Sequence, residues 1–211
     1  MRNVEVLDMI NKGRIEDLKK KLEDEIYTET LTHKAPGAKQ RYATMKKYFT
    51  YAKTEREILK KPCEIEFEGE TYISFCNSYS LALTTEPCGE MEMCEDPSRY
   101  PDVSRLIHFD GNEQQVDFAP VFAEAKAKGY KNKKSEFYSN KYLMRYNGAY
   151  FRLVLFENTY NIINNGKEVA VYHTGKNRPM CIKNDIGICM IMPVRYEGDP
   201  EENGDIVVEV K

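Results

Sequence analysis

Three stretches of the chain carry residue types that catalysis or metal binding would need, but none has the required spacing. His173-Thr174-Gly175-Lys176 has the end of a phosphate-binding loop, yet Ala170 stands where that loop needs its first glycine. Asp199 to Asp205 offers the oxygens of a calcium loop, but Val210 takes the twelfth position, where a bidentate Glu is required. The histidines lie in separate segments without ligand spacing: His33, His108 and His173. We therefore expect a protein that is not an enzyme and that carries no cofactor or metal.

Acidic residues and cysteines give the same expectation. The stretch from Glu86 to Ser98 is predicted to be a solvated loop whose acids repel one another, although it could collect a cation (Glu86, Glu90, Glu92, Glu95 and Asp96). Cys88 and Cys94 fall in this loop without a second pair of ligands for zinc. We expect all six cysteines to be reduced thiols, as in a cytoplasmic protein.

Composition bounds the class of protein. With 41% hydrophobic and 31% charged residues among 211, the chain is predicted to be globular rather than disordered. The absence of an apolar run near the roughly 18 residues of a membrane span, and of an apolar leader after Met1, predicts a cytoplasmic protein without a membrane partner. A net charge of -3 argues against wrapping nucleic acid over the whole surface, but allows a local basic face.

Residues 1–40 are expected to form an N-terminal helical extension and a linker. Between residues 4 and 27, Ile15, Leu18, Leu22 and Ile26 recur at helical spacing with lysines opposite, and Gly13 separates a short first turn. The stretch from Thr30 to Gln40, with Pro36-Gly37, is predicted to be the linker. Such a helix can pack on the rest of the chain, or it can protrude and contact a partner or a second copy.

Residues 41–211 are predicted to form one α+β domain. A helix from Arg41, with Tyr42, Met45 and Tyr48 on one face, should reach Pro62, and three antiparallel strands should follow up to Thr85. A second helix is expected from about Phe118 to Tyr130, with Pro120 in its first turn. A strand ending at Tyr146, a helix from Tyr150 to Asn164 and three strands up to Tyr196 then form a second unit of similar shape, before a last strand at 206–210.

Short motifs within this second unit carry a resemblance to a known family. They are Tyr146-Asn147-Gly148-Ala149-Tyr150, Arg178-Pro179-Met180-Cys181-Ile182 and the segment from Gly187 that ends in Met192-Pro193-Val194-Arg195, with a fainter match at Tyr100-Pro101-Asp102. In this order they resemble the final half-domain of the bacterial sliding clamp, the beta subunit of replicative DNA polymerase. In that motif, Asn147 would cap the helix that follows. The resemblance covers about a third of the chain and implies a DNA-clamp-like domain of two half-units, each a helix plus antiparallel strands.

The resemblance also implies two surfaces. Helical Lys and Arg side chains would face duplex DNA without reading its bases, and the candidates are Lys46, Lys47, Lys53, Arg56, Lys126 and Lys128. A separate basic cluster, Lys131, Lys133 and Lys134, lies near Tyr130 and Tyr138, which could stack on bases. The closing strand would accept short apolar peptides of replication or repair proteins through Met192, Pro193, Val194 and Arg195. The chain departs from the family near that peptide pocket, because Asn77-Ser78-Tyr79-Ser80 replaces the family's Asp-Gly-containing turn.

The expected function is therefore a non-enzymatic, clamp-like domain that associates with DNA or with replication and repair proteins. A single such domain cannot close a ring, so this route requires a homo-oligomer or an adaptor role. Two alternatives stay open. One is a protein–protein interaction module without nucleic acid, and the other is a small metal-dependent hydrolase or nuclease whose carboxylates converge only in the folded chain.

Overall fold

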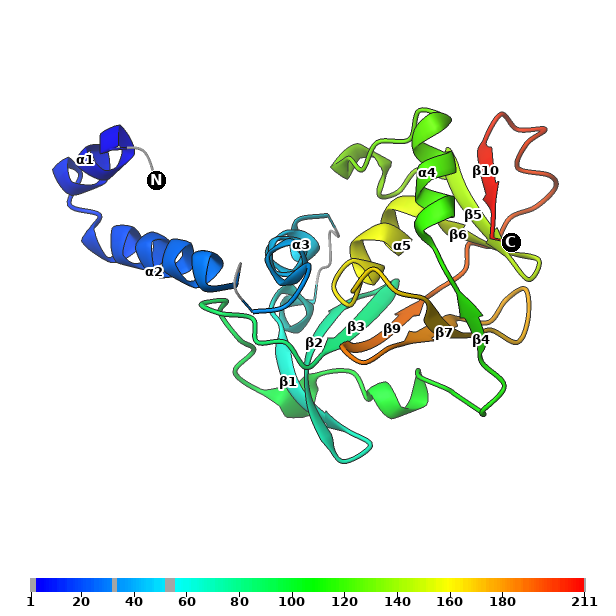
Figure 1. Cartoon of the computed structure of the whole chain (residues 1–211), viewed down its shortest axis with the longest axis horizontal. Coiled ribbons are helices and arrows are strands. Elements are labelled where there is room, and N and C mark those ends of the chain that lie inside the picture. Colours follow the sequence, from blue (N-terminus) through cyan, green and yellow to red (C-terminus); the bar gives the residue numbers. More distant parts are fainter. Residues whose placement is uncertain (1–2, 32–33, 52–55, 211) are drawn as a thin grey trace.

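The chain folds into a helical arm that projects from an α+β body (Figure 1). The computed structural model describes residues 3–31, 34–51 and 56–210. The helices are α1 (Asn3–Asn11), α2 (Ile15–Leu31), α3 (Ala38–Tyr51), α4 (Ala119–Ala127) and α5 (Leu153–Tyr160). The strands are β1 (Cys63–Phe67), β2 (Glu70–Asn77), β3 (Ser80–Thr84), β4 (Gln114–Val116), β5 (Tyr142–Tyr146), β6 (Ala149–Arg152), β7 (Val169–Tyr172), β8 (Met180–Lys183), β9 (Gly187–Ile191) and β10 (Ile206–Glu209).

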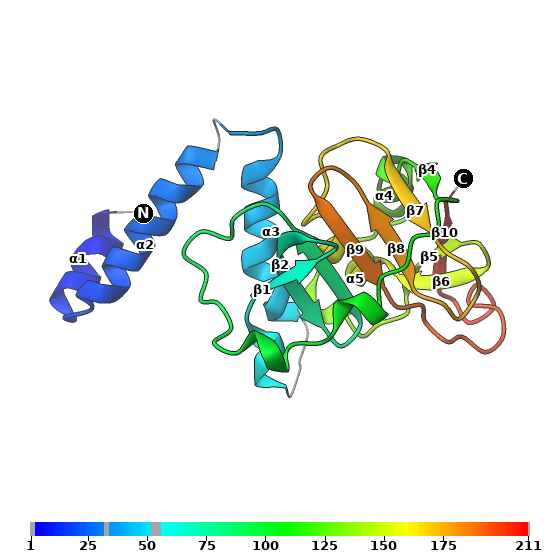
Figure 2. The same cartoon turned by 90° about the horizontal axis from the view of Figure 1, so that it is seen from below.

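The arm consists of helices α1 and α2, which contact each other close to the turn that joins them. Gly13, with φ of 66°, separates α1 from α2, as the sequence predicts, and Met9 and Leu18 are buried where the two helices meet. Helix α2 extends beyond the predicted segment to Leu31. Its C-terminal half reaches α3, and most of the arm stands clear of the body (Figure 2).

A seven-stranded antiparallel sheet forms the base of the body, in the order β1-β2-β3-β9-β8-β7-β4. Strands β1, β2 and β3 follow α3 along the chain, and strands β7, β8 and β9 follow α5. Each helix and its three strands form one unit, and the two units meet edge to edge in the sheet. Their last strands, β3 and β9, form the joint. Gly187 pairs there with Thr84, and a Cβ at Gly187 would lie 2.0 Å from the carbonyl oxygen of Leu83. Only glycine therefore fits this register.

The helices of the body cover one face of this sheet. Apolar side chains of α3, α4 and α5 pack on Phe75, Ala82 and Cys189 in one large core cluster. A second cluster, with Tyr100, Val103 and Ile107, covers the opposite face. The small sheet, in the order β10-β5-β6, lies beyond α5, so that α5 sits between two sheets and contacts β3, β9, β5 and β6. The fold is α+β, as expected.

Several predicted boundaries are wrong, among them the end of the helix at Asn164, because α5 ends at Tyr160, and a local turn explains where α5 begins. Asn147 does not cap a helix: with Gly148 it forms a two-residue hairpin turn, both at positive φ, which joins β5 to β6. The predicted helix from Tyr150 is therefore strand first, and α5 starts at Leu153. The closing strand ends at Ile191 rather than at Tyr196, and a separate 3-10 helix, Glu57–Lys60, precedes Pro62.

The expectation of six free thiols is also wrong. Cys63 and Cys94 are bonded as a disulfide, with their Cα atoms 5.1 Å apart. The loop after β3 folds back onto β1, because the Cys94 N–H donates a hydrogen bond to the carbonyl oxygen of Pro62 at 2.8 Å. Sequence spacing does not reveal the pair, because 31 residues separate the two cysteines along the chain. The remaining four cysteines are free and buried.

Candidate docking surface

Three exposed apolar side chains from separate segments gather on the body. Among the described residues of the body, the large apolar side chains most exposed to solvent are Tyr79 at 38%, Tyr138 at 45% and Met192 at 40%. The Met192 N–H donates to the carbonyl oxygen of Tyr79 at 3.0 Å, and the rings of Tyr79 and Tyr138 lie 6.2 Å apart. We call these three residues with Arg152 the Tyr79 patch. Exposed apolar clusters of this kind mark contact sites.

A buried hydrogen-bond network fixes the turn that presents Tyr79. The side-chain oxygen of Asn77 accepts from the backbone N–H groups of Tyr79 and Ser80, at 3.0 and 2.9 Å. The Ser80 hydroxyl lies 2.9 Å from the hydroxyl of Tyr48 on α3 and 2.8 Å from that of Thr159 on α5. Buried polar groups that satisfy one another in this way hold a single geometry. The patch is therefore presented by a rigid turn.

The patch carries a positive charge, and the chain on either side of Tyr138 is rich in basic residues. The Arg152 guanidinium lies over the Tyr79 ring at 5.9 Å and is oriented by a hydrogen bond to the Asn140 side chain at 2.9 Å. Residues 131–152 hold six basic residues against one acid, Glu136, in a chain whose net charge is -3. Lys133, Lys134 and Lys141 are exposed in this stretch. The rim therefore favours an acidic partner, while the apolar centre favours an apolar side chain.

The structure brings the predicted peptide-binding segment to this place. Met192 follows the last residue of β9, next to the turn at 77–80. Val194 pairs with Tyr150 of β6, where its N–H donates to the Tyr150 carbonyl oxygen at 2.7 Å, so the segment crosses from the large sheet to the small one. Pro193 is half-buried and Arg195 is exposed. The predicted peptide-binding segment thus lies beside the turn at 77–80.

The predicted DNA-facing residues that the structure describes come from α3, from α4 and from the segments that follow these helices. On α3, Lys46 and Lys47 are both exposed, and Lys46 pairs with Asp24 of the arm at 2.7 Å. Lys53 lies outside the described residues. Arg56 is exposed and lines an open cavity of about 580 Å³. Other charged residues that line this cavity are Lys61, Arg99, Glu57, Glu95 and Asp96. Every residue of α5 except Glu157 is buried, so α5 offers no exposed helical face.

On α4 and the loop after it, lysines are exposed. Lys126 lines a cavity of about 530 Å³ with Phe122, Glu157 and Tyr160. Lys128 pairs with Glu124 at 2.8 Å and donates to the carbonyl oxygen of Val207. The exposed loop lysines are Lys131, Lys133 and Lys134. Of the two tyrosines beside them, only Tyr138 can stack on a base, because Tyr130 is buried with its hydroxyl on Glu157 at 2.8 Å.

The acids of the loop after β3 have separate partners. Glu86 pairs with the buried Arg41, and Glu92 pairs with Lys61. Within the described part of the chain, no group of three or more His, Cys, Asp or Glu side chains could hold a metal ion. Among the described residues, the acids of this loop therefore form no shared cation site.

The histidines also stay apart. His173 lies between the rings of Tyr146 and Phe151, and burial lowers its pKa below the ordinary value. His108 is exposed, and its ring lies 6.5 Å from that of Tyr172. His33 lies outside the described residues.

The sequence pattern predicts the wrong element for one residue of the patch. Arg152 lies within a hairpin strand where the sequence spacing suggests a helix, so its position at the patch is not apparent from the sequence. The available signal was the Asn147-Gly148 pair flanked by aromatic residues, which is a strong hairpin indicator. A strand there places Arg152 at the end of β6, directly before α5.

The comparisons with known proteins yielded no relative. No family model, no curated protein and no solved structure matches the chain. Among the helices of the described residues, none has both the length and the apolar character to cross a membrane.

Proposed function

We propose that this chain is a non-enzymatic, clamp-like interaction module that docks a short segment of a partner protein on the Tyr79 patch. The observation that carries the proposal is the hydrogen bond between Met192 and Tyr79. It joins the turn at 77–80 to the Met192-Pro193-Val194-Arg195 segment on an exposed apolar surface. Two segments far apart in the sequence thereby build one surface, as a docking site requires.

The chemistry of the patch defines the partner segment. Two tyrosine rings and a methionine side chain form an apolar contact area, and methionine adapts to differently shaped side chains. Arg152 and the neighbouring lysines add positive charge at the rim. We infer a segment with one or two apolar anchors and at least one acidic residue, which suits the short peptides of replication or repair proteins that the clamp resemblance implies.

The fold is compatible with that resemblance at a coarse level. Two units of a helix and three antiparallel strands share one sheet, with their helices on one face. The buried position of α5 departs from a surface of exposed helices, so DNA contact through α5 is not part of the proposal. Peptide docking is supported by more of the observed geometry than ring formation around DNA.

A binding measurement tests the proposal. A labelled clamp-binding peptide with apolar anchors and an acidic residue is titrated with the wild-type chain and with Met192→Ala, Tyr79→Ala and Arg152→Ala. We expect each substitution to weaken binding by about 1–2 kcal/mol, as truncation of a side chain at the centre of an interface does. Ile26→Ala, a substitution of an exposed apolar residue of the arm, is the matched control and should bind normally. Absence of binding by the wild type would reject peptide docking.

A second candidate function is non-specific contact with duplex DNA. The observation that favours it is the run of exposed lysines on α4 and its loop, Lys126, Lys131, Lys133 and Lys134. Such lysines displace counterions from the phosphates, so retention of DNA should fall steeply with salt. Lys133→Ala with Lys134→Ala should lower the slope of log affinity against log salt by about one for each phosphate that is no longer neutralised. The Met192→Ala variant should retain DNA like the wild type, which separates the two candidates.

A further inference from the structure

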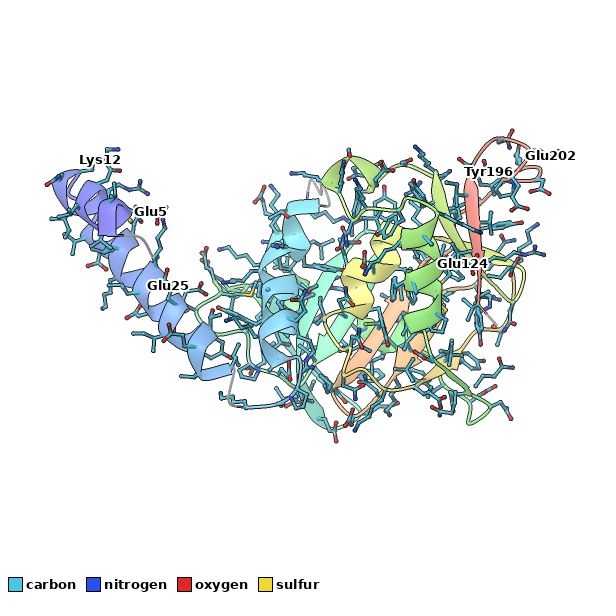
Figure 3. All side chains as sticks on the ribbon, turned by 45° about the horizontal axis from the view of Figure 1, so that its top comes forward. Glu5, Lys12, Glu25, Glu124, Tyr196 and Glu202 are labelled. Atoms are coloured by element: carbon cyan, nitrogen blue, oxygen red, sulfur yellow. A yellow bond between two sulfur atoms is a disulfide. The ribbon has the colours of Figure 1, made fainter. Side chains whose placement is uncertain are left out.

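The arm carries an apolar stripe that faces away from the body. Ile15, Leu22 and Ile26 lie seven and four residues apart, hence on one side of α2, and are 54%, 42% and 62% exposed. The body contacts the opposite side of the helix, through Asp24 and Tyr27. Figure 3 shows the arm, where Glu5, Lys12 and Glu25 are labelled, standing clear of the body. A partner could therefore reach the stripe without displacing any of the described residues.

The charges around this stripe are antisymmetric about Leu22. The sequence Lys19-Lys20-Lys21-Leu22-Glu23-Asp24-Glu25 places three bases before the leucine and three acids after it. Lys20 and Asp24 lie on the body side, where they line a small cavity with Tyr42, and Lys21 borders the same cavity from the edge of that side. At 100° per residue, Lys19 and Glu23 flank the stripe on one side, and Lys21 and Glu25 flank it on the other. Each flank thus carries one charge of each sign.

We propose that two copies of this chain associate through α2 as an antiparallel helix pair, with the twofold axis at Leu22. The two Leu22 side chains then meet each other on the axis. On one flank Lys19 faces Glu23 of the partner copy, and on the other Lys21 faces Glu25 of the partner copy. Twofold symmetry repeats every contact, so a self-complementary surface of this kind closes as a dimer.

The charges select the antiparallel orientation. In a parallel pair the lysines of one helix would lie beside those of the other, and the acids beside the acids, because residues of equal height meet. Like charges across an interface are unfavourable, whereas the antiparallel pair places opposite charges together on both flanks. Charge complementarity therefore points to a second copy of this chain as the occupant of the stripe.

The geometry also places the two bodies favourably. Since the stripe faces away from the body, the twofold axis puts the two bodies on opposite sides of the helix pair, where they do not collide. The Tyr79 patch lies on the body and stays accessible in both copies. Helix α1 adds exposed Val4, Leu7 and Ile10 to the apolar area of each arm. The dimer would thus present two docking patches at once, which increases the avidity for a partner that repeats its binding segment.

Sedimentation of the full chain over a concentration series is the first test. We expect a monomer–dimer equilibrium for the wild type and loss of the dimer for Leu22→Glu, which would place two carboxylates against each other on the axis. Met192→Ala, an exposed apolar substitution on the body, should leave the equilibrium unchanged. A monomeric wild type at every concentration, or a Leu22→Glu variant that still dimerises, would overturn the proposal.

Charge reversal tests the pairing and also controls for folding. Lys19→Glu with Lys21→Glu leaves only acids on both flanks, and Glu23→Lys with Glu25→Lys leaves only bases, so each variant alone should be monomeric. Mixing the two variants should restore a dimer, which also shows that both are folded. Failure of the mixture to form a dimer, while each variant has the circular dichroism of the wild type, would refute the predicted ion pairs.

Cross-linking tests the orientation. In the antiparallel pair Leu22 lies on the twofold axis, so Leu22→Cys should form a covalent dimer on mild oxidation. Ile15 lies at the far end of the pair from Ile15 of the partner copy, so Ile15→Cys should not. In a parallel pair both variants would cross-link, and that result would reject the antiparallel arrangement.

Discussion

The arm and the Tyr79 patch both expose apolar side chains, but they are built in different ways. On the arm, Ile15, Leu22 and Ile26 follow the period of a single helix. On the patch, Tyr79, Tyr138 and Met192 come from a hairpin turn, a loop and the end of a strand, and only the folded body brings them together. One surface is therefore local and the other depends on tertiary structure.

Different contacts hold the Tyr79 patch and the arm in place. The patch rests on the buried network around Ser80, which joins α3 and α5 to the turn. The arm is held at one end, where Tyr42 and Lys46 of α3 contact Asp24 at 2.6 and 2.7 Å and Tyr27 packs on Tyr42. The close approach of Gly89 to both tyrosines completes this junction. Changes in the arm should thus leave the patch intact, and the following predictions test that independence.

The largest effect is expected at Arg41, where the linker meets the body. Its buried guanidinium pairs with Glu86 and donates to the carbonyl oxygens of Pro36 and Asn164, at 2.8 and 3.1 Å. Arg41→Met should lower the free energy of unfolding by about 3 kcal/mol in urea titrations, because it leaves Glu86 half-buried without its partner. The double variant with Glu86→Gln should recover part of this loss. A change below about 1 kcal/mol would contradict a structural role for the pair.

The next effect should separate the patch from the arm. Asn77→Ala removes the acceptor of two backbone N–H groups in the turn, so we expect a loss of about 2 kcal/mol in stability and of peptide binding. Sedimentation should show an unchanged equilibrium between monomer and dimer. Ser78→Ala, at an exposed position of the same turn, is the matched control. Loss of self-association in Asn77→Ala would show that the two surfaces are coupled.

The same contrast explains what the sequence could predict. Helix α2 of the arm follows from the spacing of Ile15, Leu18 and Leu22, and strands β1 and β2 follow from alternation in residues 64–67 and 71–75, whereas β3 is buried at every position and does not alternate. The order of the strands could not be predicted, because the pairing of β3 with β9 joins residues about a hundred positions apart. The contact of Met192 with Tyr79 depends on that pairing. The sequence therefore indicated the Met192 segment as a candidate docking surface but could not show that it meets the turn at 77–80.

A smaller effect is expected at the junction of arm and body. Burial alone would raise the pKa of Asp24, but hydrogen bonds from Lys46 and Tyr42 outweigh it and hold this pKa below the ordinary value of 3.8. The ionised Asp24 carboxylate thus stabilises the junction fully above pH 3.8. This stabilisation is lost as the pH falls through the lower pKa that Asp24 has in the folded state. Asp24→Asn should weaken the junction by about 1 kcal/mol, because the pair is partly exposed.

Hydrogen exchange of α2 measures this change. We expect faster exchange in the C-terminal half of α2 for Asp24→Asn, with the urea midpoint of the body unchanged. Asp17→Asn breaks an exposed ion pair with Arg14 beside the same helix and serves as the control. Equal exchange in the wild type and Asp24→Asn would mean that Tyr27 alone holds the arm.

The smallest effect belongs to the body alone and appears at a different pH. Burial lowers the pKa of His173 below 6.5, so the unfolded chain binds the proton more readily than the folded body. The body should therefore lose stability as the pH falls below 6.5, by less than about 1 kcal/mol since the residue is only half-buried. His173→Phe should remove this slope from urea titrations, and His108→Gln, at an exposed position, should not. Because the arm from α1 to α2 has no histidine, the protection of its amides, corrected for the intrinsic pH dependence of exchange, should stay constant over this range. An arm that loosens together with the body near this pH would show that the two regions unfold as one unit.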